Sequence, residues 1–262
     1  MPVGRRVVLV TGAAKRAGRA FAEYFSERGD ALVVHYGASA SEAASLVASI
    51  RLRGGTAVAM QADLRDPEQI RVLVERAYRH YGKVDVLINN ASVFGQDAFS
   101  DFNVETLEEA WLVNYRAPIL LARAFYDLAK AANATGVVVN VVDQKVKGSF
   151  HKDHFTYTVG KAGIGNLTQM LAISAHPVLR VNAVFPGLML ESDDQTADDF
   201  AYASRHATPL GVIATPEDVA GAIDLLTSPA YNGFDFLVDG GQHLVKRTQD
   251  VLYEHRAPKN DE

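Results

Sequence analysis

The chain contains no cysteine among its 262 residues, and this absence excludes several chemistries at once. Disulfides, thiolate nucleophiles and cysteine-ligated zinc cannot occur. No segment approaches the roughly 18 consecutive apolar residues that a membrane-spanning helix needs. The apolar run that follows Arg5 and Arg6 is also too short for the core of a secretory signal peptide. We therefore expect a cytoplasmic protein with no membrane partner.

An excess of positive charge is lacking as well. The net charge is −5, and the basic residues are scattered, so we expect no nucleic-acid partner. His151, His154 and His176 are spaced like no known ligand set, so we predict that they lie in loops or at the surface and that no metal is bound. A content of 48% hydrophobic and 22% charged residues suits one sizeable domain.

Short β-branched runs alternate with longer helical patterns along the chain. The alternation predicts an α/β fold: a doubly wound parallel sheet of about seven strands with helices on both faces. The strands are expected at 6–10, 32–36, 57–61, 84–89, 136–142, 180–185 and 234–238. The helices are expected at 17–28, 40–53, 67–81, 104–131, 157–175 and 216–228.

The turn between the first predicted strand and helix reads TGAAKRAG (11–18). Small residues such as Gly12 and Gly18 let the backbone approach a pyrophosphate, whose charge the helix N-terminus stabilises. Lys15 and Arg16 add positive charge. Residues 35–39, at the end of the second strand, contain no carboxylate to bind the ribose hydroxyls of NAD, and Ser39 can donate a hydrogen bond there. These features favour NADP(H) over NAD(H).

Two polar positions near the ends of later strands have alternative interpretations. Asp63, after the third strand, can hold the adenine edge or can cap the following helix. Asn114 lies in the long helical pattern, where an amide is a poor helix former. It can hold a water and a backbone carbonyl in a proton path, or it can be a satisfied polar residue between helices. Asn90 and Ala91, after the fourth strand, are expected beside the cofactor's second ribose.

The stretch 140–161, NVVDQKVKGSFHKDHFTYTVGK, is the strongest candidate for the chemistry. Asp143 follows a buried strand, at the sheet edge where parallel sheets open into a ligand crevice. Tyr157 and Lys161 are four residues apart at the start of a helical pattern and project from one face. A nearby ammonium favours the phenolate, so Tyr157 would act as a general acid or base. A second Y-x-x-x-K pair at 126–130 follows no such strand and is interpreted as packing and solvent exposure.

In their order and spacing, the motifs resemble the short-chain dehydrogenase/reductase family across nearly the whole chain. The resemblance implies one Rossmann-like domain that transfers a hydride between nicotinamide C4 and a substrate. It also implies that Tyr157 is the acid/base, that Lys161 binds the nicotinamide ribose and that Asn114 completes the relay. The matching motifs are TGAAKRAG, the acid at 63, NNAS (89–92), Asn114, Tyr157-x-x-x-Lys161, Pro186-Gly187 and VDGG (238–241).

Three departures from the general family pattern resemble its pteridine reductase branch. Arg16 stands at the middle glycine of the first turn, Phe94 follows NNAS, and Asp143 replaces the usual catalytic serine. An ionised carboxylate cannot donate to a carbonyl oxygen as a serine does, and its charge would raise the pKa of a neighbouring tyrosine. A pterin, with ring C=N bonds and N–H groups, suits an acid there. The resemblance implies substrate contacts from Arg16, Ser92, Phe94, Asp143, Tyr157 and Leu188.

We therefore expect an NADPH-dependent reductase of a pterin or folate-like heterocycle, with Tyr157 as proton donor. One alternative is a carbonyl or 3-oxoacyl reductase of the same family, and another is a dinucleotide-binding sensor without turnover. Residues 1–245 would form the dinucleotide-binding and catalytic domain, with a substrate flap at about 188–210 and a charged surface tail at 246–262. The resemblance suggests a homotetramer built on the helices at 104–131 and 157–175.

Overall fold

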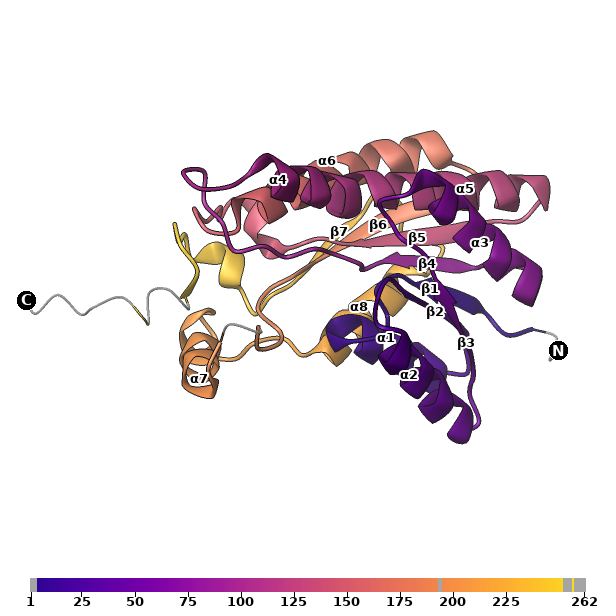
Figure 1. Ribbon diagram of the computed structural model, residues 1–262, viewed down its shortest axis with the longest axis horizontal. Coiled ribbons are helices and arrows are strands. Elements are labelled where there is room, and N and C mark those ends of the chain that lie inside the picture. The colour runs from indigo at the N-terminus through magenta and orange to yellow at the C-terminus, as the bar shows by residue number, and fades with distance from the viewer. Residues whose placement is uncertain (1–3, 193–194, 252–255, 257–262) are drawn as a thin grey trace, which may run out of the picture.

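Seven parallel strands form the centre of the molecule, in the spatial order β3-β2-β1-β4-β5-β6-β7 (Figure 1). The structure is a computed structural model that describes residues 4–192, 195–251 and 256. The predicted α/β class is confirmed, and each predicted strand is present to within two residues. The strands are β1 (Val7–Val10), β2 (Ala31–Tyr36), β3 (Thr56–Gln61), β4 (Val86–Asn89), β5 (Gly136–Val141), β6 (Leu179–Pro186) and β7 (Asp235–Val238).

Helices cover both faces of this sheet. Figure 1 shows α1, α2 and α8 on one face and α3, α4, α5 and α6 on the other, with α7 beyond the sheet. Both faces of the inner strands are buried, which explains why their sequences are continuous apolar runs such as VVLV in β1. The helices are α1 (Arg16–Glu27), α2 (Ala40–Leu52), α3 (Pro67–Tyr81), α4 (Val104–Ala110), α5 (Ala117–Ala131), α6 (Phe155–Ala175), α7 (Ala197–His206) and α8 (Pro216–Leu226).

The strand order reverses at β1, which pairs with β2 on one side and β4 on the other. Open parallel sheets bind ligands at such a reversal, beyond the carboxyl ends of the strands. The loops that leave β1, β4 and β5 therefore mark the candidate site.

The long helical pattern at 104–131 is not one continuous α-helix. A π-helical segment η1 (Trp111–Arg116) separates α4 from α5 and contains Asn114. A π-turn inserts one residue into the helical ladder and often occurs at functional sites. Hydrophobic periodicity did not reveal it, because the apolar face continues through the segment.

The substrate flap was expected at about 188–210, and the structure has a helix there, α7, that was not predicted. Its N-terminus carries a capping box: the Thr196 side chain accepts from the Asp199 amide, and Asp199 accepts from the Thr196 amide. Thr-x-x-Asp was visible in the sequence and is the signal that predicts this helix. Residues 193–194 of the expected flap lie outside the described residues.

The expected surface tail is described at 246–251 and 256, and the rest of it lies outside the described residues. Val251 is only 2% exposed and belongs to an apolar cluster with Ala203 of α7 and Ala207, which follows that helix. Arg256 forms an ion pair with the buried Asp199 at 2.6 Å. Val251 and Arg256 therefore contact the flap region, and Val251 is buried there while Arg256 is exposed.

Among the described residues, we find no helix whose length and apolar character would let it span a bilayer.

Candidate active site

The loop after β1 is packed so closely that glycine is required at two positions. A Cβ on Gly12, whose φ is +62°, would lie 2.9 Å from the Cα of Ala91. A Cβ on Gly18 would lie 2.2 Å from the carbonyl oxygen of Gly12 and 2.6 Å from Asn90 Nδ2. Asn90 also donates to the Thr11 carbonyl at 2.9 Å. Gly12, Gly18, Asn90 and Ala91 therefore form one cradle, as expected for a loop that brings its backbone close to a pyrophosphate.

His35, at the end of β2, supports this loop, a role that we did not predict. Its Nδ1 accepts a hydrogen bond from the Gly12 amide at 3.0 Å, and its Nε2 lies 3.1 Å from the Ala62 carbonyl. Only the neutral ring can accept from Gly12 while it donates to Ala62. Burial lowers the pKa of His35 to about 4, so the ring is neutral at physiological pH. The sequence did offer a signal for this role, namely a histidine in the strand next to the glycine-rich turn.

The two basic residues of the loop point to different partners. Arg16 adopts a left-handed conformation with φ 53°, and its guanidinium donates to the Glu191 carbonyl at 2.7 Å. It therefore links the loop to the start of the expected flap. Lys15 forms an ion pair with Glu42 of α2 at 2.6 Å. Ser39 is the N-cap residue of α2, with no side-chain capping hydrogen bond.

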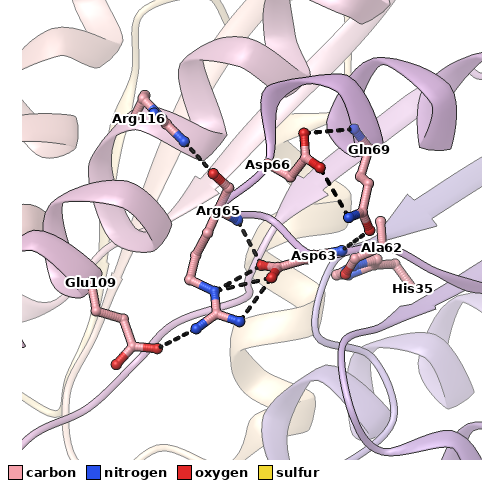
Figure 2. Close-up of polar contacts among 8 residues, drawn as sticks. All are labelled: His35, Ala62, Asp63, Arg65, Asp66, Gln69, Glu109 and Arg116. Carbon is pink, nitrogen blue, oxygen red and sulfur yellow. Dashed lines mark hydrogen bonds and ion pairs between the residues drawn. The ribbon is translucent and has the colours of Figure 1, made fainter.

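Asp63 does not cap α3, because that position is held by Asp66, whose side chain accepts from the amides of Glu68 and Gln69. The Asp63 carboxylate instead pairs with Arg65 at 2.8 Å (Figure 2). The Arg65 hydrogen bonds lower the pKa of Asp63, so it remains an acceptor. The helix-cap alternative for Asp63 is wrong, and an adenine edge would have to share the carboxylate with Arg65.

Asn114 holds the turn that follows β4. Its Oδ1 accepts from the Val93 amide at 2.9 Å and from Ser92 Oγ at 3.1 Å. Its Nδ2 donates to the Val93 carbonyl at 2.9 Å. The buried amide is thus satisfied by the loop beside the site, which the π-turn in η1 allows it to face. These contacts position Ser92 and the residues after it.

Asp143, Tyr157 and Lys161 are brought together at the carboxyl end of β5. The Tyr157 hydroxyl donates to Asp143 Oδ2 at 2.8 Å, and Asp143 Oδ1 accepts from the Lys145 amide at 2.8 Å. Lys161 Nζ donates to the Val141 carbonyl at 2.8 Å and lies 5.8 Å from the centre of the Tyr157 ring. The structure therefore brings together three of the residues predicted for the acid/base centre, of which Tyr157 and Lys161 are buried.

The electrostatics of this centre differ from the expectation that Lys161 favours the phenolate. Burial raises the pKa of Tyr157 well above its ordinary value, and the Asp143 charge and hydrogen bond raise it further. Burial lowers the pKa of Lys161 to about 8, against an opposing effect of Asp143. The carboxylate in contact with the phenol thus outweighs the more distant ammonium. Tyr157 is held as a protonated phenol, which is the form that donates a proton.

Phe94 lies at the exposed edge of this centre. Its ring centroid is 4.8 Å from that of Tyr157 in a T-shaped contact, and the side chain is 51% exposed. His154 stacks on it at 4.2 Å, and Lys145 Nζ lies 5.7 Å from the ring centre. An aromatic ring that is supported by a stacked neighbour and still half exposed is suited to hold a flat ligand.

His151 and His154 lie in the loop before α6, as expected, but they are buried. His151 and His154 are 7% and 4% exposed, whereas His176 is exposed. His154 has φ 58° and its Nδ1 bonds to the Gly95 carbonyl at 2.8 Å. Burial, followed by the charge of Lys145, lowers its pKa, so the ring stacks on Phe94 in its neutral form. The burial of His154 could not be predicted from hydrophobic periodicity, because this residue lies in a loop.

The segment after β6 closes the site on its other side. Pro186 ends the strand, and a Cβ on Gly187 would lie 2.6 Å from Gln242 Oε1. The Leu188 amide donates to the same oxygen at 2.9 Å, and its side chain packs against the cluster of α7. The start of the expected flap is therefore held by η3 (Gln242–Leu244), which contains Gln242.

The fold and this site define an α/β protein of the Rossmann type with a buried Tyr-x-x-x-Lys pair at the carboxyl end of β5 in a parallel sheet. A family model described as Enoyl-(Acyl carrier protein) reductase matches residues 12–243. The chain therefore belongs to the short-chain dehydrogenase/reductase family, which confirms the resemblance found in its motifs.

The similar proteins have varied activities. The chain is 33% identical to L-rhamnose 1-dehydrogenase (NAD(P)(+)) of Sphingomonas sp. (strain SKA58), covering 91% of this chain and 96% of that protein. It is 31% identical to glucose 1-dehydrogenase 2 of Bacillus subtilis (strain 168), covering 91% and 95%. Among solved structures, FolM alternative dihydrofolate reductase 1 from Brucella canis complexed with NADP has a TM-score of 0.86. It is 32% identical, and the match covers 95% of this chain and 98% of that one.

Proposed function

We propose that the protein is an NADPH-dependent reductase of a pterin or folate-like heterocycle. The observation that carries the proposal is the hydrogen bond of 2.8 Å between Tyr157 and Asp143, with the Phe94 ring 4.8 Å from that of Tyr157. The similarity to FolM alternative dihydrofolate reductases in complex with NADP supports both the substrate class and the cofactor.

The residues of the site fit a dinucleotide. The Gly12 and Gly18 positions leave no room for a Cβ, so the backbone amides of this loop and of the α1 N-terminus can approach a pyrophosphate. Asn90 and Ala91 would lie beside the nicotinamide ribose, Lys161 would bind its hydroxyls, and Pro186 and Gly187 would adjoin the ring. Lys15, Arg16 and Ser39 would contact the adenosine phosphates, and Asp63 the adenine edge.

The bound cofactor would supply a hydride to the ring carbon of a C=N bond. Tyr157 would donate the proton to the adjacent nitrogen, since its raised pKa keeps the phenol protonated. Loss of that proton would place a phenolate against the Asp143 carboxylate, and two such anions repel. The positive charge of Lys161 would compensate for this repulsion, and the Asp143 carboxylate would accept a hydrogen bond from a ring N–H.

The substrate would lie against Phe94, which stacks on one side of the flat ring. Arg16 would reach its polar edge from the loop after β1, and Ser92 would lie at the turn held by Asn114. We propose that residues 188–210 act as the flap over the ring, with Leu188 in contact with it. This would exclude water from the hydride transfer.

A substrate panel, followed through the nicotinamide absorbance with NADPH and with NADH, tests the proposal. It contains dihydropterins, quinonoid pterins, dihydrofolate and keto thioesters, and it includes L-rhamnose and glucose with the oxidised cofactors. We expect turnover of a pterin or folate with NADPH. Turnover of the keto thioesters or sugars alone would overturn the substrate assignment.

A carbonyl or sugar oxidoreductase is the second candidate, because the similar sequences include L-rhamnose and glucose dehydrogenases. The same panel separates the two candidates. A non-catalytic sensor is the third, and the buried Tyr157 and Lys161 pair argues against it, since a sensor has no need of a proton donor.

We also propose a homotetramer that uses α4, η1 and α6. Trp111, Val159, Met170 and Ile173 on these helices are 46%, 43%, 59% and 80% exposed. Contiguous exposed apolar side chains often mark subunit interfaces. By contrast, the buried residues of the apolar run at 117–125 pack within the chain's own core. Light scattering of the purified protein would measure the assembly, and a monomer would contradict it.

A further inference from the structure

The strongest further feature concerns the choice between NADPH and NADH. NADPH carries a 2′-phosphate on the adenosine ribose, and this group lies at the carboxyl end of the second strand in Rossmann-type folds. Here the residues at that point are Gly37, Ala38 and Ser39, which supply no charge. Lys15 lies close to this point, because it is paired with Glu42 in the first turn of α2, the helix that follows the second strand.

Lys15 is already paired. Its Nζ lies 2.6 Å from Glu42 Oε1, and Glu42 stands in the first turn of α2. Ser41 Oγ donates to the second carboxylate oxygen of Glu42 at 2.8 Å, which holds the carboxylate in this orientation. The hydrogen bond from Lys15 lowers the pKa of Glu42 to about 2, so the carboxylate is charged throughout the neutral range.

We propose that Glu42 is a specificity-determining residue that reduces the preference for NADPH over NADH by competing with the 2′-phosphate for Lys15. The inference rests on the proposed function, since it assumes that the cofactor binds at this end of the sheet. A dianionic phosphate must displace the Glu42 carboxylate from Lys15 and then lies near an uncompensated negative charge. NADH has no group at this position and leaves the ion pair intact.

The preference for NADPH over NADH would therefore be smaller than if Lys15 were not paired with Glu42. Glu42 also has a structural role, because an acidic side chain in the first turn stabilises a helix. The two roles are separable: a structural role would change thermal stability alone, whereas competition would change the ratio of the two nucleotide affinities.

The test measures the Kd of NADPH and of NADH by fluorescence titration of the full chain, without a substrate. We expect Glu42→Gln to raise the ratio of the NADH Kd to the NADPH Kd by about threefold, the size of a single exposed charge interaction. The increase should shrink at roughly 0.5 M salt, where screening is strong. Glu75→Gln, which breaks an ion pair with Arg71 on α3, is the matched control and should not change the ratio.

A second variant makes the test independent of any effect on folding. Lys15→Met should lower the NADPH preference more in the Glu42→Gln background than in the wild type, because only there is the lysine fully available. Equal effects in the two backgrounds, or an unchanged ratio for Glu42→Gln, would overturn the role of Glu42. Absence of binding of either nucleotide to the wild type would instead overturn the proposed function, and this inference with it.

Discussion

Replacing Tyr157 by phenylalanine removes one atom from the centre of the site and leaves the rest in place. The hydroxyl makes its hydrogen bond to Asp143 Oδ2, and the ring packs with 7% exposure. Asp143 keeps its second hydrogen bond, from the Lys145 amide, and Lys161 keeps its bond to the Val141 carbonyl. The substitution therefore removes the proton donor without opening a cavity in the core.

The size of the effect follows from the role of the phenol. A positioned general acid contributes roughly 10²- to 10⁴-fold to a rate, which corresponds to about 3 to 5 kcal/mol of activation free energy. We expect kcat to fall by at least about 100-fold. The free energy of unfolding should change by about 1 kcal/mol or less, the usual net contribution of one hydrogen bond.

The chain provides a matched control for Tyr157→Phe. Tyr126 and Lys130 on α5 repeat the Y-x-x-x-K spacing, with Lys130 Nζ 5.5 Å from the centre of the Tyr126 ring. Tyr126→Phe should leave kcat unchanged. The assay is NADPH consumption with the pterin that the panel identifies, together with the NADPH Kd of each variant. A Tyr157→Phe enzyme that keeps more than about a tenth of the wild-type kcat would refute the role of Tyr157 as general acid.

Three further predictions concern other buried groups. The pKa of His35 falls from 6.5 to about 4 on folding, so its stabilising effect is complete above pH 6.5 and is lost as the pH falls towards 4. The free energy of unfolding should fall by about 3 kcal/mol over this range. Denaturant titrations of His35→Gln at the same pH values should not show this fall. The pKa of Lys161 falls from 10.5 to about 8, so the unfolded chain binds more protons between these values and the free energy of unfolding should rise with pH. Denaturant titrations should show a rise of about 3 kcal/mol, absent in Lys161→Met; an identical rise in that variant would contradict the assignment. His154→Asn keeps a residue that tolerates a left-handed backbone but removes the ring stacked on Phe94. It should raise KM for the heterocycle while the NADPH Kd stays constant, and the exposed His176→Asn should change neither.

The fold was predictable because its signals are local and repeated. The inner strands are apolar runs buried on both faces, and their alternation with helical segments predicted the parallel arrangement. The deviations have specific causes. Helix α7 was missed because its apolar positions are few, although Thr196 and Asp199 form a recognisable cap. The π-turn at Asn114 was missed because it depends on contacts with the Val93 backbone, which lies 21 residues away.

The site was predictable in its membership and less so in its electrostatics. Spacing along one helix placed Tyr157 beside Lys161, and the end of β5 placed Asp143 opposite them. Which of the two charges dominates the phenol depends on distances that the sequence does not contain. Asp143 lies in hydrogen-bond contact with the hydroxyl, while the Lys161 ammonium is bonded to the Val141 carbonyl. His35 and His154 show the same limit, because their partners come from distant loops.

Reduction and oxidation require different protonation states of the Tyr157 phenol. Oxidation of an alcohol or sugar needs a base to take the hydroxyl proton, so the tyrosine must first lose its own proton. Reduction of a C=N bond needs the opposite, a tyrosine that still holds a proton when the hydride arrives. Burial and the Asp143 carboxylate both raise the pKa of Tyr157, and the lysine that would counter them has its own pKa lowered to about 8. In the proposed reductase, these two effects would favour proton donation over the proton abstraction that a sugar dehydrogenase needs. This is the physical reason to prefer a reductase among relatives of such mixed activity.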